Sequence, residues 1–207
     1  KAASLPQATK DWLDVVDINQ VLTGTIDSIC ERLLRDFRDP GTQPPVLADE
    51  FVTKTLLLRE GLFPNRRFDD ADLDEMLLEL HGGSRFGFHV GRKNDLLLST
   101  WDRRFHDQID WSGFVAGGVN PGEQQARQVI REASQDYEAA LAARGMVDFA
   151  LLEQEVLTQL LGGGFSEFTE KVRVVLVDEY QDSNLLQERL YFELAKACEG
   201  ALTVVGD

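Results

Sequence analysis

The sequence predicts an α/β protein in which a parallel sheet is interrupted by a large, mostly helical insertion. Two apolar runs near the C-terminal end, Val172–Val177 and Leu202–Val205, are typical of buried parallel strands. Gln20–Gly24 is a third, short strand candidate, and roughly a hundred residues between these strands show helical periodicity. We therefore expect one domain formed by residues 1–48 and 147–207, with residues 49–146 as a helical subdomain inserted into it.

Most of the first half of the chain is predicted to be helical, with clear breaks between helices. Apolar residues three and four apart indicate a buried helix face, as Ile29, Leu33 and Leu34 do. Asp39-Pro40-Gly41 and Pro44-Pro45 interrupt the pattern, because proline and glycine favour turns. The expected helices are Trp12–Val16, Ser28–Phe37, Glu50–Glu60, Asp70–Leu80 and Lys93–Asp107, with Gly82–Gly91 as a loop or a distorted helix end.

The second half contains the longest predicted helix, Glu123–Arg144, which we expect to end at Gly145. The preceding stretch, Ser112–Gly122, is expected to be a loop because it contains four glycines and Pro121. The remaining expected helices are Phe149–Leu161, stopped by three glycines, and Leu185–Cys198, with Asn184 and Gln187 at N-cap and N3 spacing.

Composition limits the classes of protein that the chain can represent. It has 207 residues and 43% hydrophobic residues, which is ordinary for a globular protein, and no apolar run approaches a membrane span. Cys30 and Cys198 are predicted to be buried reduced thiols, and the three histidines lack zinc-ligand spacing, so we expect a cytoplasmic protein without a zinc site. The net charge of −15 argues against a self-sufficient DNA binder, which usually carries a basic surface.

The predicted strand Val172–Val177 ends on two consecutive carboxylates, Asp178 and Glu179. Ligands of parallel α/β sheets gather at the carboxyl ends of strands. In that position one carboxylate can hold the Mg²⁺ that bridges nucleotide phosphates, and its neighbour can position or deprotonate the attacking water. An acidic turn after a strand is also common, so the pair alone leaves both interpretations open.

Longer sequence blocks favour the catalytic interpretation. VLVDEYQDSNLLQ (residues 175–187) contains an apolar strand, the acidic pair, Gln181, Asp182 and a Ser-Asn step. The other blocks are TGTIDSICERLLR (residues 23–35), Tyr137–Leu152 and the final LTVVGD (residues 202–207). In this order the four blocks resemble motif II, motif Ib, the exit from the inserted subdomain and the start of motif III of the UvrD/Rep-like superfamily 1 DNA helicases.

The resemblance implies a RecA-like (P-loop NTPase) motor domain, 1A, that hosts a mostly helical subdomain, 1B. It also implies ATP and Mg²⁺ as cofactors, DNA as the partner and translocation in the 3′→5′ direction. The implied roles are Mg²⁺ binding for Asp178, general base in ATP hydrolysis for Glu179, coupling to the nucleotide for Gln181, Asp182 and Asp207, and DNA phosphate binding for Thr25 and Ser28.

The sequence also departs from the family pattern. It contains no G-x-x-x-x-G-K-[ST] phosphate loop, so we expect an incomplete RecA-like sheet and a helicase fragment without ATPase activity of its own. Ile26 and Asp27 replace the usual aromatic residue and histidine of motif Ib. A carboxylate facing a DNA phosphate is repulsive, so Asp27 is expected to cap its helix instead.

Two other functions remain open at this point. A metal-dependent nuclease or phosphohydrolase would use Asp178 and Glu179, but it requires further carboxylates around the metal. A non-catalytic helical interaction module would keep only a remnant of the motor domain. At the residue level, Thr25 and Ser28 also suit helix N-capping, and Gln181 and Asp182 suit capping of the following helix.

Overall fold

The computed structural model describes residues 21–37, 41, 43–59, 71–82 and 90–207 of the chain. It is rich in helices and contains two small parallel sheets. Within the described ranges, no helix combines the length and the apolar character needed to cross a membrane. The helices are α2 (Ile26–Asp36), α3 (Glu50–Arg59), α5 (Ala71–Leu80), α6 (Val90–His106), α7 (Trp111–Ala116), α8 (Pro121–Ala142), α9 (Phe149–Leu161), α10 (Ser166–Thr169) and α11 (Leu185–Ala197), and the strands are β1 (Val46–Leu47), β2 (Met146–Val147), β3 (Val174–Val177) and β4 (Ala201–Val204).

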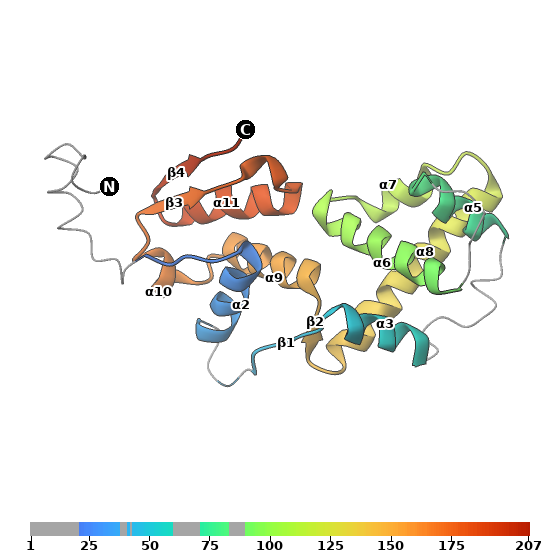
Figure 1. Cartoon of the computed structure of the whole chain (residues 1–207), viewed down its shortest axis with the longest axis horizontal. Coiled ribbons are helices and arrows are strands. Elements are labelled where there is room, and N and C mark those ends of the chain that lie inside the picture. The colour runs from blue at the N-terminus through green and yellow to red at the C-terminus, as the bar shows by residue number, and fades with distance from the viewer. Residues whose placement is uncertain (1–20, 38–40, 42, 60–70, 83–89) are drawn as a thin grey trace, which may run out of the picture.

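The prediction of two adjacent parallel strands near the C-terminal end is confirmed. β3 pairs with β4 in a parallel register that places Val174 opposite Ala201 and Val177 opposite Val204. The connection between them is α11, which packs against both strands, as expected for a parallel crossover (Figure 1). The helix begins at the predicted capping box, in which Asn184 and Gln187 bond reciprocally.

The second sheet joins two segments that lie about a hundred residues apart in the sequence. β1 pairs with β2 in parallel, with Val46 opposite Met146 and Leu47 opposite Val147. The pair is extended by the bond from Ala48 N to Val147 O, at 2.8 Å. This pair was not predicted, because two-residue strands carry no periodicity.

Two hydrophobic clusters form the interior. The first is built mainly by α3, α5, α6 and α8, with Trp101 stacked on Tyr137 at a ring-centroid distance of 5.1 Å. The second is built mainly by α2, α9 and α11, and it includes the buried thiol of Cys30. Figure 1 shows these two sets of helices toward opposite ends of the molecule, with α9 between α2 and α11. The helix α9 thus lies next to both predicted functional segments.

The expected strand Gln20–Gly24 is wrong over its described part. Val21–Gly24 has no regular structure, and the Val21 side chain is 50% exposed. A strand needs a partner for its backbone N–H and C=O groups, and the described part of the chain pairs no strand with these residues. Residues 21–24 therefore do not share the sheet of β3 and β4 as expected. Trp12–Val16 and most of Gly82–Gly91 lie outside the described residues.

The expected loop Ser112–Gly122 is also wrong, because it begins with the short helix α7. Asp110 caps this helix by accepting hydrogen bonds from Ser112 N at 3.1 Å and Gly113 N at 2.8 Å. Trp111 and Phe114 pack against the first hydrophobic cluster. Capping and the partial burial of two aromatic side chains therefore outweigh the low helix propensity of glycine.

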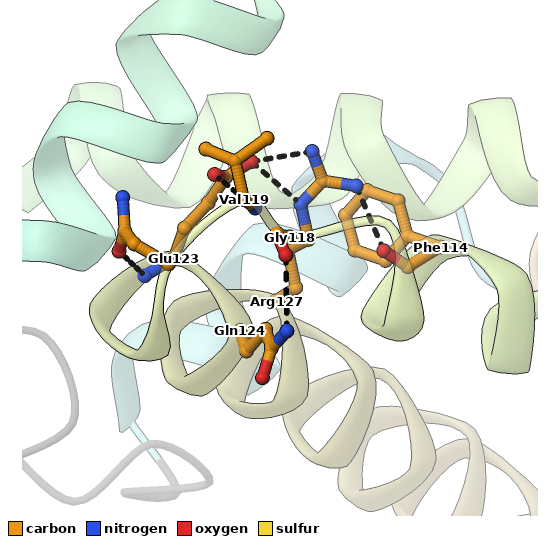
Figure 2. Close-up of polar contacts among 7 residues, drawn as sticks. Phe114, Gly118, Val119, Glu123, Gln124 and Arg127 are labelled. Carbon is orange, nitrogen blue, oxygen red and sulfur yellow. Dashed lines mark hydrogen bonds and ion pairs between the residues drawn. The ribbon is translucent and has the colours of Figure 1, made fainter.

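A polar network holds α7 against the first turns of α8 (Figure 2). Arg127 donates to the Phe114 carbonyl at 2.8 Å and to the Glu123 carboxylate at 2.6 Å. The other oxygen of Glu123 accepts from Val119 N at 2.8 Å. A Cβ on Gly118 would lie 2.7 Å from Gln124 Cγ, so the close passage of the loop requires glycine at this position.

Candidate functional site

The predicted acidic pair lies at the carboxyl end of β3. Val177 is buried, whereas Asp178 and Glu179 are exposed directly after the strand. Glu179 has φ of 52° and ψ of 41°, a left-handed conformation that is uncommon for a residue with a side chain. Asp178 Oδ1 accepts a hydrogen bond from Glu179 N at 3.0 Å. The chain therefore turns sharply at the strand end and presents both carboxylates to solvent.

Gln181 connects the acidic pair to the end of the neighbouring strand. Its Nε2 donates to Glu179 Oε2 at 2.6 Å, and its Oε1 accepts from Asp207 N at 3.3 Å. The backbone supports this connection, since Tyr180 N donates to Val205 O at 2.9 Å. A Cβ on Gly206 would lie 2.2 Å from Gln181 Oε1, so a larger residue at this position would displace the Gln181 amide. Three predicted residues, Glu179, Gln181 and Asp207, thus meet at one edge of the sheet.

Asp182 is placed differently from the other predicted residues of this segment. It ends the 3₁₀ turn Tyr180–Asp182, its backbone N–H donates to Glu179 O at 2.9 Å, and its side chain is exposed. Tyr180, to which the sequence assigned no role, donates its hydroxyl to the Glu188 carboxylate on α11. The turn is therefore held against α11 through Tyr180.

Thr25 and Ser28 form the N-terminal cap of α2. Thr25 Oγ1 accepts from Ser28 N at 3.3 Å, and Ser28 Oγ donates to Thr25 O at 2.8 Å. Both residues are exposed. The expectation that Asp27 caps the helix is wrong, because Thr25 occupies the cap. Asp27 instead lies in the first turn and faces α9, where Glu153 is its partner.

Asp27 and Glu153 form a carboxyl pair that was not predicted from the sequence. Burial raises the pKa of Glu153 to about 7, and burial also raises the pKa of Asp27 above its ordinary value. The Glu153 side chain accepts a hydrogen bond from Gln187 Nε2 at 2.7 Å. A sequence signal was present, because Glu153 occupies an apolar position of α9, in helical register with Val156, Leu157 and Leu160.

A separate open pocket of about 600 Å³ is lined by residues of α3, α6 and α8 and by the start of α9. Asp148 caps α9 at this pocket by accepting from Leu151 N at 2.8 Å, and it accepts the Tyr137 hydroxyl at 2.8 Å. Burial raises the pKa of Asp102, another lining residue, to about 7. None of the predicted site residues lines this pocket.

Comparison with known proteins places the chain in a family. Residues 2–207 match the UvrD/REP helicase N-terminal domain. An ATP-dependent helicase/nuclease subunit of Geobacillus thermodenitrificans is 33% identical over 176 residues, covering 77% of this chain and 13% of the relative. The ATP-dependent DNA helicase UvrD1 of Mycobacterium tuberculosis is 31% identical over 159 residues, covering 72% and 20%.

The relatives are much longer than this chain. A second helicase/nuclease subunit, from Pelotomaculum thermopropionicum, is 41% identical over 90 residues, covering 38% of this chain and 7% of the relative. The chain therefore spans between 7% and 20% of the length of these three proteins. Because the family match extends over residues 2–207, the chain belongs to the UvrD/REP helicase N-terminal domain family.

Proposed function

We propose that this chain is part of an ATP-dependent DNA helicase, in which Asp178 binds the Mg²⁺ of ATP and Glu179 activates the attacking water. The observation that carries the proposal is the pair of exposed carboxylates at the carboxyl end of β3, joined through Gln181 to Asp207 just beyond the end of β4. Membership of the helicase family supports the same interpretation.

The residues present fit a magnesium ion. Asp178 is an exposed carboxylate that accepts one hydrogen bond at Oδ1, which leaves Oδ2 without a partner among the described residues. Mg²⁺ at nucleotide sites is commonly held by one or two carboxylates, phosphate oxygens and waters. The ion would neutralise developing charge on the phosphates, while Glu179 would accept a proton from the attacking water.

We propose that Gln181 and Asp207 couple this site to the motif III strand. The Gln181 amide joins the carboxylate of Glu179 to the backbone of Asp207, so movement of one strand end changes the position of the base. Asp182 is part of the same turn through its backbone bond to Glu179 O. We propose that Asp182 helps to fix the shape of this turn.

The proposed partner is single-stranded or partly duplex DNA, contacted at a phosphate by the exposed N-terminal turn of α2. Helix N-termini favour negatively charged groups, and small hydroxyls contact phosphates without reading sequence. Thr25 accepts a hydrogen bond at Oγ1, so its hydroxyl hydrogen remains available to a phosphate oxygen. Movement in the 3′→5′ direction is part of the proposal through the family resemblance alone.

We further propose that residues 1–48 and 147–207 belong to a RecA-like motor domain and residues 49–146 to its inserted helical subdomain. The β1–β2 pair supports these boundaries, because it brings the start and the end of the helical tract together. The division of the hydrophobic side chains into two clusters supports the same boundaries.

The proposal is tested by Glu179→Gln in the full helicase that contains this chain. Binding of ATP with Mg²⁺ is expected to persist, because Asp178 and the nucleotide-binding groups remain. Turnover in the presence of DNA is expected to fall by about a hundredfold or more, since the general base is lost. Unchanged turnover in this variant would remove the role of Glu179, and the exposed Glu155→Gln on α9 serves as the control.

The nuclease alternative gains no support from the described residues. It requires additional carboxylates that converge on the metal near Asp178 and Glu179. No group of three or more His, Cys, Asp or Glu side chains in the described ranges is placed to hold a metal ion. The helical interaction module is likewise not favoured by any specific contact, so the helicase is the function that we propose.

A further inference from the structure

We propose that Glu153 is a positioning residue, which shares a proton with Asp27 and thereby links the DNA-facing turn of α2 to the helix that follows motif II. This inference rests on the proposed function and adds to it the path by which DNA binding reaches the ATPase site. The link is made of three side chains, Asp27 on α2, Glu153 on α9 and Gln187 on α11.

The burial of Glu153 is the first observation. Glu153 is 2% exposed, among the lowest values in the described part of the chain, although glutamate is rarely buried without a partner. One oxygen, Oε1, accepts from Gln187 Nε2 at 2.7 Å. The other, Oε2, is buried and receives no hydrogen from any donor of the described residues. Oε2 therefore lacks a hydrogen-bond donor unless Glu153 itself, or a carboxyl group beside it, carries a proton.

The neighbouring carboxyl group supplies the explanation. Asp27 and Glu153 lie within hydrogen-bonding reach of each other, and two ionised carboxylates would repel at this separation. Burial raises the pKa of both groups, while their hydrogen bond acts to lower the pKa of Asp27 and to raise that of Glu153, so the shared proton resides on Glu153. A protonated Glu153 donates to Asp27 while it accepts from Gln187, which satisfies both of its oxygens.

The groups around the pair do not replace this proton. On α2, burial and the two carboxyls raise the pKa of Cys30, which keeps the thiol neutral. On α6, the negative charge of Asp27 favours the charged form of His106, but burial has the larger effect and lowers the pKa of His106. On α11, burial and the two carboxyls raise the pKa of Tyr191. The carboxyl hydrogen of Glu153 is thus the hydrogen-bond donor to the negatively charged Asp27.

Gln187 carries the link onward to motif II. Its Oε1 accepts from Asn184 N at 3.3 Å and its backbone N–H donates to Asn184 Oδ1 at 2.9 Å, which together close the capping box of α11. The cap of α11 follows directly on the turn Tyr180–Asp182 that contains Gln181. The same Gln187 amide therefore holds both Glu153 and the start of α11.

At the other end, Asp27 lies between Thr25 and Ser28, the two residues of the exposed cap of α2. In the described part of the chain, no hydrogen bond joins this cap to motif II directly, whereas α9 packs against both α2 and α11 (Figure 1). Movement of α2 on DNA binding therefore reaches α11 through α9. Loss of the proton from Glu153 would place two negative charges side by side and break the link.

The experiment measures the ratio of ATPase rates with and without single-stranded DNA in the full helicase, at about pH 6.5 and about pH 8.5. The wild-type ratio is expected to fall by roughly threefold to tenfold at the higher pH, as Glu153 loses its proton. Glu153→Gln retains a donor toward Asp27 and an acceptor toward Gln187, so its ratio is expected to stay high at both values. Glu153→Leu removes both contacts and is expected to give a low ratio at both.

Glu155→Gln is the matched control, because Glu155 lies on the exposed face of α9 and is expected to keep the wild-type pH dependence. A wild-type ratio that is independent of pH, or that changes with pH as much in Glu153→Gln, overturns the proposal. If Glu153→Leu does not fold, the comparison of the wild type with Glu153→Gln still decides it.

Infrared difference spectroscopy separates failure of the link from failure of the proposed function. A protonated carboxyl band near neutral pH that disappears in Glu153→Gln is expected from the shared proton. Absence of that band overturns the carboxyl pair even in an active helicase. A wild type that hydrolyses ATP without any response to DNA overturns the proposed function and, with it, the coupling role.

Discussion

At the scale of single residues, the two hydroxyls at the start of α2 are not equivalent. The Ser28 hydroxyl donates its hydrogen to Thr25 O at 2.8 Å. The Thr25 hydroxyl accepts a hydrogen bond at Oγ1, so its own hydrogen remains available. A phosphate oxygen needs a donor, so Thr25 suits the proposed DNA contact better than Ser28. Helix capping and phosphate binding are therefore compatible at Thr25, although the sequence presented them as alternatives.

Substitutions at Thr25 separate these two roles. Thr25→Asp keeps a good N-cap but places a negative charge where a phosphate is expected. We expect the full helicase with this change to bind single-stranded DNA roughly tenfold more weakly, which corresponds to about 1.4 kcal/mol. Thr25→Ser, which keeps cap and hydroxyl, should bind like the wild type in fluorescence anisotropy titrations. Equal affinity of both variants would refute the contact.

Gly206 tests the link between Glu179 and the motif III strand. In Gly206→Ala the new Cβ would lie 2.2 Å from Gln181 Oε1, so the Gln181 amide must move away from Asp207 N. We expect kcat for DNA-stimulated ATP hydrolysis to fall by about tenfold, because the base loses its fixed position. The double variant with Gln181→Ala should be no slower than Gln181→Ala alone, and additive losses would contradict the proposed clash.

The sequence predicted the residues that meet at the strand ends, but it did not predict the contact between two helices that lie far apart in the chain. Glu179, Gln181 and Asp207 were chosen from one sequence block and its neighbour, and the structure brings them into contact. The partnership of Asp27 and Glu153 could not be predicted, because the residues lie far apart in the chain and meet only when α2 packs on α9. The apolar register of Glu153 indicated burial, but burial alone does not identify a partner.

At the scale of elements, helices with a cap and a periodic apolar face were predicted well. Phe149–Leu161 was predicted with the bounds that the structure shows, and Asp148 caps it. The capping box of α11 was likewise predicted from Asn184 and Gln187. α7 was missed because its stability comes from Asp110 and from two aromatic contacts to the core, which tertiary packing alone reveals. β1 and β2 were missed for the same reason, since each exists only through the other.

The junction of α7 and α8 gives a prediction about stability. In Arg127→Met the aliphatic part of the side chain is kept, but Phe114 O and Glu123 Oε1 lose their donor (Figure 2). Arg127 also stacks over the Phe114 ring at 4.9 Å. We expect the free energy of unfolding to fall by about 1–3 kcal/mol. Arg131→Met, one turn further along α8, is the control in thermal denaturation and should have a much smaller effect.

At the scale of the whole molecule, the net charge of −15 limits what this chain does alone. DNA affinity depends largely on contacts between basic groups and phosphates, so an acidic chain is expected to bind weakly. We expect the 207-residue chain to bind single strands weakly and with a strong dependence on salt. Titration at two salt concentrations checks this expectation, and tight binding that is insensitive to salt would contradict it.

The buried carboxyls give the chain an unusual dependence of stability on pH. The pKa values of Glu153 and Asp102 are each raised to about 7, from 4.5 and 3.8, chiefly by burial. Between those ordinary values and pH 7 the folded chain binds protons that the unfolded chain has already released. The stability that these groups contribute is therefore fully present below about pH 4, falls as the pH rises toward about 7, and is absent above it.

We accordingly expect the melting temperature of the chain to be higher at about pH 5.5 than at about pH 8. Self-repulsion among the surplus acidic groups acts in the same direction, because protonation of carboxyls reduces it. The double variant Glu153→Gln, Asp102→Asn separates the two causes, since it keeps the exposed charges and removes the two buried titrations. Its melting temperature should change less with pH than that of the wild type. Equal slopes for both proteins in calorimetry would contradict the raised pKa values of Glu153 and Asp102.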